Sequence, residues 1–238
     1  MMLMKKSKAF NIKRFLKKAK KFNQFESKNF EEVVQYYESS ASQVTLKKLG
    51  LKLVVISDTH GDLAFDNRFE KFMNNIPEYD LVVILGDIYC YELDHITKII
   101  PTDRIISLRG NHDSFDIYDR YGIKNINGQI FNYKGVRFAG IEGSFKYKKE
   151  EFPSFTHYES LLLATSMPQE ADVLLTHDCM FRESKYDIAH SGLAGITYYI
   201  FNNNITWHIH GHIHKSYQDT YSNGTTEKSV YGCEYLEV

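Results

Sequence analysis

The sequence predicts an α/β fold for most of the chain, and three observations support this prediction. Short apolar segments rich in β-branched residues, at 51–56, 81–85 and 104–108, have the composition of strands buried in a parallel sheet. Segments with apolar residues at helical spacing, at 66–76 and 92–100, alternate with these strands. Each strand leads directly into a cluster of polar residues, and ligands bind at that edge of an open α/β sheet.

The next part of the chain is predicted to be richer in β structure. Residues 129–133 and 136–141 flank Lys134-Gly135 and indicate a hairpin, and the loop that follows contains Lys and aromatic residues. Thr156 and Glu159 resemble a capping box, which predicts a helix through Leu163.

The last third alternates again before it ends in β structure. We expect a strand at 172–175, a helix at 192–203 and a strand at 205–210. Two extended segments, 215–221 and 230–236, are then expected to pair around Asn223-Gly224, which is a strong hairpin signal.

Length, charge and cysteine content limit the classes of protein that fit. The 238 residues suffice for one large domain, predicted at 51–238, and a small helical extension at 1–50. Residues 1–48 contain 12 Lys/Arg and 4 Asp/Glu, a formal charge of +8, so the remainder carries −9. No apolar run is long enough to span a bilayer, and the basic start lacks the apolar core of a signal peptide. Three widely spaced cysteines suggest no disulfide framework, and we therefore expect a cytoplasmic protein.

The basic extension is predicted to form two or three short helices. Apolar residues recur at helical spacing between the lysines of residues 12–22. A second helix is expected from Asn29, with Glu32 completing a capping-box-like start and Tyr37 in its apolar stripe, and a third short segment covers 42–49. Such helices fit a helix-turn-helix that holds nucleic-acid phosphates, but also an amphipathic arm that packs on the main domain.

Polar clusters with metal-ligand chemistry follow five of the predicted strands. Imidazole is the commonest metal ligand among side chains, and carboxylate and amide oxygens complement it. Each cluster alone has an ordinary explanation as a helix cap, a turn or a histidine tract. The clusters, in chain order, are Asp58-Thr59-His60, Gly86-Asp87, Gly110-Asn111-His112-Asp113, Thr176-His177 and Gly211-His212-Ile213-His214.

Together these clusters resemble the motif set of the calcineurin-like metallophosphoesterase family, in the form found in small bacterial and phage phosphoesterases. The resemblance covers residues 51–238 and implies a four-layer α/β/β/α sandwich of two mixed sheets flanked by helices. It also implies that His112 protonates the leaving oxygen or stabilises charge on the phosphoryl group. By the same resemblance, one metal ion is held by Asp58, His60 and His214, a second by Asn111, His177 and His212, and both are bridged by Asp87.

The resemblance predicts a dinuclear-metal-dependent phosphodiesterase or broad-specificity phosphatase. Mixed nitrogen and oxygen ligands suit two divalent transition-metal ions, with manganese favoured and iron, nickel or zinc as alternatives. Two such ions can share a hydroxide that attacks phosphorus in line, without a phospho-enzyme. The alternative function is a nuclease, or a nucleic-acid-binding regulator, in which residues 1–50 engage DNA or RNA.

The sequence leaves the roles of several other residues undecided. Cys90 stands where many relatives have an aspartate that orients the catalytic histidine, so Asp62, Asp113 or a backbone carbonyl is expected to orient His112 instead. Arg109 either contacts phosphate or has a structural role, and His190 either lies near the site or in a solvated loop. We expect His210 to be packed rather than to bind metal. We expect His95 and His157, which lie in predicted helices, at the surface.

Overall fold

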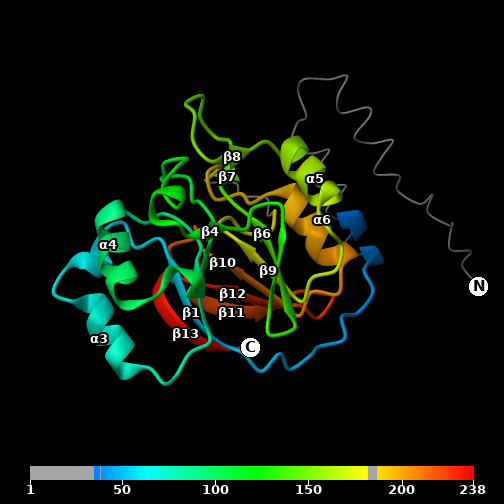
Figure 1. Ribbon diagram of the computed structural model, residues 1–238. Helices are drawn as coiled ribbons and strands as arrows, with labels where there is room; N and C mark the ends of the chain where they lie inside the picture. Colours follow the sequence, from blue (N-terminus) through cyan, green and yellow to red (C-terminus); the bar gives the residue numbers. More distant parts are fainter. Residues whose placement is uncertain (1–34, 38, 182–186) are drawn as a thin grey trace, which may run out of the picture.

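The computed structural model describes residues 35–37, 39–181 and 187–238, which contain two mixed β-sheets flanked by helices (Figure 1). The first sheet has the strand order β13-β1-β2-β3-β4. Four of its strands are parallel, and only β13 runs antiparallel, against β1. The strands are β1 (Lys52–Ser57), β2 (Leu81–Ile84), β3 (Ile105–Ser107), β4 (Lys124–Asn125) and β13 (Gly232–Glu237).

The second sheet has the order β11-β12-β10-β9-β6-β5, with antiparallel hairpins at both edges and parallel pairs between them. A separate two-stranded pair is formed by β7 (Ser144–Phe145) and β8 (Ser154–Phe155). The six strands are β5 (Ile130–Tyr133), β6 (Val136–Ile141), β9 (Val173–Thr176), β10 (Trp207–His210), β11 (Tyr217–Thr220) and β12 (Thr226–Ser229).

Side-chain alternation along β1 divides the apolar core into separate clusters. Leu53 and Val55 join a cluster that also contains Phe138 and Leu175 of the second sheet, so the two sheets share this core. Val54 and Ile56 face the other way and pack with α3 (Arg68–Asn75) and α4 (Cys90–Ile99).

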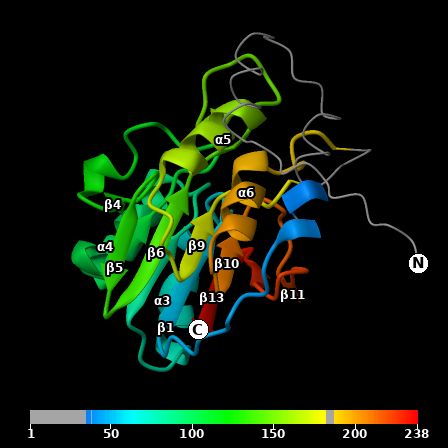
Figure 2. The ribbon, with the colours of Figure 1, turned by 90° about the vertical axis from the view of Figure 1, so that its right-hand side faces the viewer.

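The outer face of the second sheet is covered by α5 (His157–Ser166) and α6 (Ala194–Asn202), as Figure 2 shows. Ala139 and Ile141 of β6 pack in one cluster with Ile196 and Tyr199 of α6. The predicted α/β class, with two mixed sheets flanked by helices, is therefore confirmed. Three short 3-10 helices complete the described elements, at Asp62–Ala64, Thr102–Arg104 and Asp119–Tyr121.

Local signals account for several of these elements. Thr156 Oγ1 accepts a 3.2 Å hydrogen bond from Glu159 N, and Thr156 N donates to Glu159 Oε2 at 2.8 Å, which confirms the capping box at the start of α5. β5 and β6 pair antiparallel across Lys134-Gly135, as the hairpin signal predicts.

The predicted partner of the last hairpin is wrong. Asn223-Gly224 does form the turn, but it joins β11 to β12, with Tyr217 opposite Ser229. The polar residues of β12 hide this strand in the sequence. The segment expected to pair there, β13, instead crosses to the first sheet and pairs with β1 over six residues.

The third short segment of the N-terminal extension, which the sequence left open as a possible helix, is not helical. Residues 41–50 have no regular secondary structure. The segment bonds to the body instead, from Val44 N to Asn223 O at 2.7 Å and from Gly50 N to Val238 O at 2.7 Å, and Lys47 pairs with Asp172 at 3.1 Å. β-branched residues and these external partners favour extended backbone over a helix.

Helical residues 35–37 and 39–40 precede this segment, and Tyr37 is buried against Tyr198 of α6 with ring centroids 5.3 Å apart. The first predicted helix and the start of the second lie outside the described residues. The domain boundary after residue 50 and the binding of nucleic acid by residues 1–50 stay predictions. None of the helices in the described ranges combines the length and apolar character that crossing a bilayer requires.

Candidate metal centre

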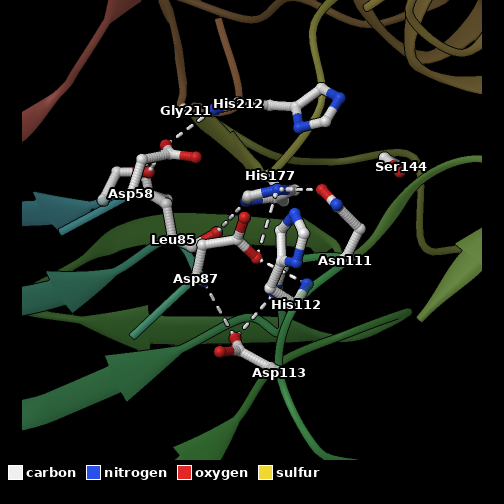
Figure 3. A network of polar contacts seen from close by, with 12 residues as sticks. Asp58, Leu85, Asp87, Asn111, His112, Asp113, Ser144, His177, Gly211 and His212 are labelled. Atoms are coloured by element: carbon white, nitrogen blue, oxygen red, sulfur yellow. Dashed lines mark hydrogen bonds and ion pairs between the residues drawn. The ribbon is translucent and has the colours of Figure 1, made fainter. Parts of the chain in front are cut away.

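The polar clusters from the two sheets meet at one edge of the molecule. Asp58 and His60 follow β1, Asp87 follows β2, and Asn111 and His112 follow β3 of the first sheet. His177 follows β9, and His212 and His214 follow β10 of the second sheet. Figure 3 shows Asp87, Asn111, His112 and His177 pointing toward one another, with Asp58 and His212 beside them.

Five of these residues adopt a backbone conformation that ordinary side chains rarely occupy. The φ angles are 54° at Asp58, 46° at His60, 56° at Asp87, 64° at His212 and 50° at His214. The described ranges contain eight non-glycine residues with positive φ, and these are five of them. Each such residue costs on the order of 1–3 kcal/mol, and clusters of them occur where function requires a particular geometry.

Two glycines allow the loops that carry the predicted ligands to approach one another closely. A Cβ atom on Gly110 would lie 2.1 Å from Asp87 Oδ1 and 2.6 Å from His177 Cε1. A Cβ atom on Gly211 would lie 2.4 Å from Asp58 Oδ2. Any larger residue at either position would therefore push the polar side chains apart.

The first predicted ligand group is assembled from both sheets. Nε2 of His60 and Nε2 of His214 face each other at 3.3 Å, and Asp58 Oδ1 lies 3.4 Å from His214 Nε2. Donor atoms of the three residues all lie within 4.8 Å of one another, so they could hold one metal ion. His212 N donates to the other carboxylate oxygen, Asp58 Oδ2, at 2.7 Å, which fixes the orientation of Asp58.

The second predicted group is also brought together. His177 Nε2 lies 3.0 Å from Asn111 Oδ1, and the rings of His177 and His212 are 4.9 Å apart. His177 Nδ1 contacts Leu85 O at 2.8 Å and His212 Nε2 contacts Ala189 O at 2.9 Å. Each carbonyl fixes one ring nitrogen as a donor and leaves the other nitrogen of the ring as a ligand atom.

Asp87 lies between the two groups. Its Oδ1 is 3.8 Å from His177 Nε2, and its Oδ2 is 3.9 Å from His60 Nε2. The two oxygens of one carboxylate thus face imidazoles that belong to different groups, as a bridging ligand requires. Asp58 also lies within 4.8 Å of the donor atoms of His177 and His212, so it stands close to both groups.

Unsatisfied buried oxygens and the charge state of His212 fit bound cations. Asp58 Oδ1 and Asp87 Oδ2 are buried and, among the described residues, accept no hydrogen bond. Leaving a buried carboxylate oxygen unpaired is costly, and a metal ion would satisfy it. Burial and the nearby His177 lower the pKa of His212 to about 3, which keeps the imidazole neutral, as a metal ligand must be.

Neither of the two carboxylates that the sequence offered as a partner for the His112 ring, Asp62 and Asp113, plays that role. Asp62 is exposed and pairs with Arg68 at 3.7 Å. The carboxylate of Asp113 is buried and accepts hydrogen bonds from the backbone N–H groups of Asp87, Ile88 and Gly110 at 2.7–3.0 Å. It therefore joins the Gly-Asp loop to the Gly-Asn-His-Asp loop rather than supporting an imidazole.

His112 itself is held through its backbone. Its N–H donates to Asp87 Oδ1 at 2.8 Å, and its ring stands edge-on to His60 with centroids 5.5 Å apart. Within the described ranges, no hydrogen bond reaches its ring nitrogens. Cys90 is half-buried in the cluster between the first sheet and its helices, where it packs as a small apolar residue.

Other open positions now have definite surroundings. Arg109 forms a two-pronged ion pair with Glu142, at 2.6 and 2.8 Å, so its role is structural. His210 is packed, with Nε2 3.1 Å from Glu227 Oε1. His190 lies beside the site, since its ring is 4.6 Å from that of His212 and it pairs with Asp187.

Two residues were missed or misjudged from the sequence. Glu92 is fully buried and accepts hydrogen bonds from Gly61 N at 2.9 Å and Leu63 N at 3.0 Å, which fixes the loop that carries His60. Its position three residues after Tyr89, at a helix start, was the available signal. His157 was expected at the surface, but it is buried between Phe145 and Phe181.

Comparison with known proteins gives one family match. Residues 51–216 match the family model described as calcineurin-like phosphoesterase. A comparison with curated proteins finds no match.

Among solved structures, the phosphopantetheinyl hydrolase of Mycobacterium tuberculosis is 14% identical, with a TM-score of 0.51 over 77% of this chain and 91% of that chain. A putative 5′-nucleotidase from Staphylococcus aureus is 14% identical over 79% of this chain and 54% of that chain, with a TM-score of 0.49. A dimetal phosphatase from Danio rerio is 12% identical over 77% and 88% of the chains, with a TM-score of 0.41. At such low identity, the match with a TM-score above 0.5 shows a shared fold.

Proposed function

The chain belongs to the calcineurin-like phosphoesterase family, a family of phosphoester hydrolases, and on this premise we propose that it is a dinuclear-metal-dependent phosphodiesterase or broad-specificity phosphatase. The observation that carries the proposal is that Asp87 lies between two groups of nitrogen and oxygen donors, with each of its oxygens facing a different group. A site with this donor set suits two divalent transition-metal ions, with manganese favoured.

We assign one ion to Asp58, His60 and His214, the other to Asn111, His177 and His212, and the bridging position to Asp87. Bound there, the ions would activate water and neutralise charge on the phosphoryl oxygens. The chain's own side chains supply the remaining conditions. Asn111 is a neutral ligand, so it leaves more positive charge available to attract phosphate. Leu85 O and Ala189 O fix the ring orientations of His177 and His212 before substrate binds.

His112 is the proposed proton donor to the leaving oxygen. Its imidazole is exposed beside His60, and its backbone N–H is bonded to Asp87, so it stands next to the ligands without being one. Proton transfer by a histidine positioned next to the reacting group contributes about 10²–10⁴-fold to turnover.

The test is His112→Asn, assayed with manganese on a chromogenic diester and a chromogenic monoester. We expect turnover to fall by about 10²-fold or more while the metal content, measured by mass spectrometry, stays unchanged. The matched control is His95→Asn, because His95 pairs with Glu70 on the outer helices and should leave turnover within about twofold. If His112→Asn retains activity within a few fold, the role of His112 is wrong; if the wild type hydrolyses neither ester, the function is wrong.

A further inference from the structure

Exposed tyrosines stand beside the candidate metal centre and have no role in it so far. Tyr89, Tyr91 and Tyr231 are 41%, 45% and 46% exposed, although large aromatic side chains usually gain by burial. Single exposed aromatic residues need no explanation, but three around one site indicate a binding surface.

The three tyrosines are linked through two predicted ligands into one row of rings. Ring centroids are 5.6 Å apart between Tyr91 and Tyr89, and 6.5 Å apart between Tyr89 and His60. The row continues through His60 and His214 at 5.1 Å and ends with Tyr231, whose ring lies 5.4 Å from that of His214 at an angle of only 25°. Tyrosines therefore stand at both ends of the His60–His214 pair.

The backbone holds these rings in position. Tyr89 N donates to the buried Glu92 carboxylate at 2.9 Å, which also binds Gly61 N next to His60. A Cβ atom on Gly61 would lie 2.1 Å from the hydroxyl oxygen of Tyr91, so this tyrosine rests directly on the loop of His60. Tyr231 N donates to Ser216 Oγ at 3.1 Å. A preorganised row binds flat groups without first losing side-chain freedom.

The flat aromatic rings of this row favour substrates that carry a flat group. We propose, on the basis of the function proposed above, that the substrate is a phosphodiester carrying a nucleobase, and that Tyr89, Tyr91 and Tyr231 determine specificity by stacking on bases on either side of the phosphorus. Stacking on an aromatic side chain strengthens binding and tolerates any base, because every base has a flat π-face. A quaternary ammonium group would instead need several rings around one point, whereas Tyr231 contacts the ring of His214 and the other two tyrosines are joined to the row through His60.

The experiment compares two diesters with the same leaving group, thymidine 5′-(4-nitrophenyl) phosphate and methyl 4-nitrophenyl phosphate, with the manganese-loaded enzyme. We expect kcat/KM of the wild type to be at least about tenfold higher for the thymidine diester. Because this diester carries a single base, at least one of Tyr231→Ala and Tyr89→Ala should lower that ratio about 5-fold or more, mainly through KM of the thymidine diester. Tyr231→Phe should retain the ratio, because a phenyl ring still stacks.

Controls separate loss of stacking from loss of folding. Phe65→Ala removes another exposed aromatic side chain and should leave the ratio unchanged. Metal content and hydrolysis of the methyl diester report whether each variant retains an intact centre. Inhibition of this hydrolysis by oligothymidylate can be compared with inhibition by thymidine diesters. Stronger inhibition by oligothymidylate would identify single-stranded nucleic acid as the source of the bases, and stronger inhibition by thymidine diesters would identify free nucleotide diesters. Both results support the inference.

Three results would overturn it. The wild type could hydrolyse both diesters equally well, or the tyrosine variants could keep the wild-type ratio. Glycerophosphocholine could be preferred in a tyrosine-dependent manner, which would indicate recognition of a cation. Inactivity of the wild type toward every ester differs from these results, because it removes the proposed function and this inference with it.

Discussion

Gly110 shows how one missing side chain keeps the metal centre compact. The Cβ atom of an alanine there would lie 2.1 Å from Asp87 Oδ1 and 2.5 Å from Asp87 N. The second distance is to backbone, which cannot rotate away as a flexible side chain can. The Gly-Asn-His-Asp loop must therefore move if Gly110 is replaced, and it carries Asn111 and His112 with it.

We expect Gly110→Ala to lose most bound metal and to lower the free energy of unfolding by about 2–3 kcal/mol, because overpacking displaces backbone. Urea unfolding in the presence of a chelator and metal analysis of the purified protein measure the two effects. The control is Gly122→Ala, where, chain neighbours apart, no atom of a residue described in the structure lies within 4 Å of the added Cβ but φ is +63°. That variant should cost about 1 kcal/mol and bind metal normally. Normal metal content in Gly110→Ala would contradict the close-packing argument.

Site residues of this kind were predictable from the sequence because strand and ligand are adjacent in the chain. Asp58, Asp87 and His177 each follow a mostly apolar strand within a few positions, so their common edge follows from parallel sheet geometry. The row of tyrosines was not predictable. Tyr231 meets His214 only because β13 leaves the second sheet, and pairing between strands distant in sequence carries no local signal.

At the scale of elements, α5 begins with a histidine that the sequence suggested was exposed. His157 stacks on Phe145 with centroids 4.5 Å apart and meets Phe181 edge-on at 4.7 Å. The capping box fixed where the helix begins, but the face that its first turn presents to the core depends on how α5 packs on the second sheet. Burial lowers the pKa of His157 to about 4.

The lowered pKa of His157 makes the stability of the fold depend on pH. Between pH 6.5 and about 4 the unfolded chain binds a proton at this residue and the folded chain does not, so acidification through this window destabilises the fold. The destabilisation is absent above pH 6.5, grows as the pH falls, and reaches about 2–3 kcal/mol by pH 4.

We expect His157→Phe, which keeps an aromatic ring in the same space, to lose this part of the pH dependence. Urea unfolding with a chelator should give curves of stability against pH that diverge below pH 6.5, with the variant becoming relatively more stable. Comparing two proteins cancels the titration of all other groups. Parallel curves would show that His157 is protonated as easily in the folded state as in the unfolded state.

For the whole molecule, the candidate centre joins the two sheets. Asp58, His60, Asp87 and Asn111 come from the first sheet, whereas His177, His212 and His214 come from the second. Ions held by both sets would add bonds across the shared core, and would compensate the two buried carboxylate oxygens that lack hydrogen bonds. Metal binding should therefore stabilise the fold as a whole.

We expect manganese at about 100 times its Kd to add about 2.7 kcal/mol to the free energy of unfolding, which raises Tm by roughly 5–10 °C over chelated protein. Thermal unfolding followed by circular dichroism measures this shift. Asp87→Asn, which removes the charge of the bridging residue, should reduce the shift by more than half. An equal Tm with manganese and with chelator would argue against a site shared by the two sheets.

Segment 41–50 lies before the family match and yet contacts the main body of the protein. Homology begins at residue 51, yet Val44 and Lys47 already bond to Asn223 and to the buried Asp172. A chain started at the homology boundary would uncover the far end of the second sheet and leave these partners to water. We therefore expect a chain that begins at residue 51 to be less stable than one that begins upstream of residue 42 and keeps these contacts.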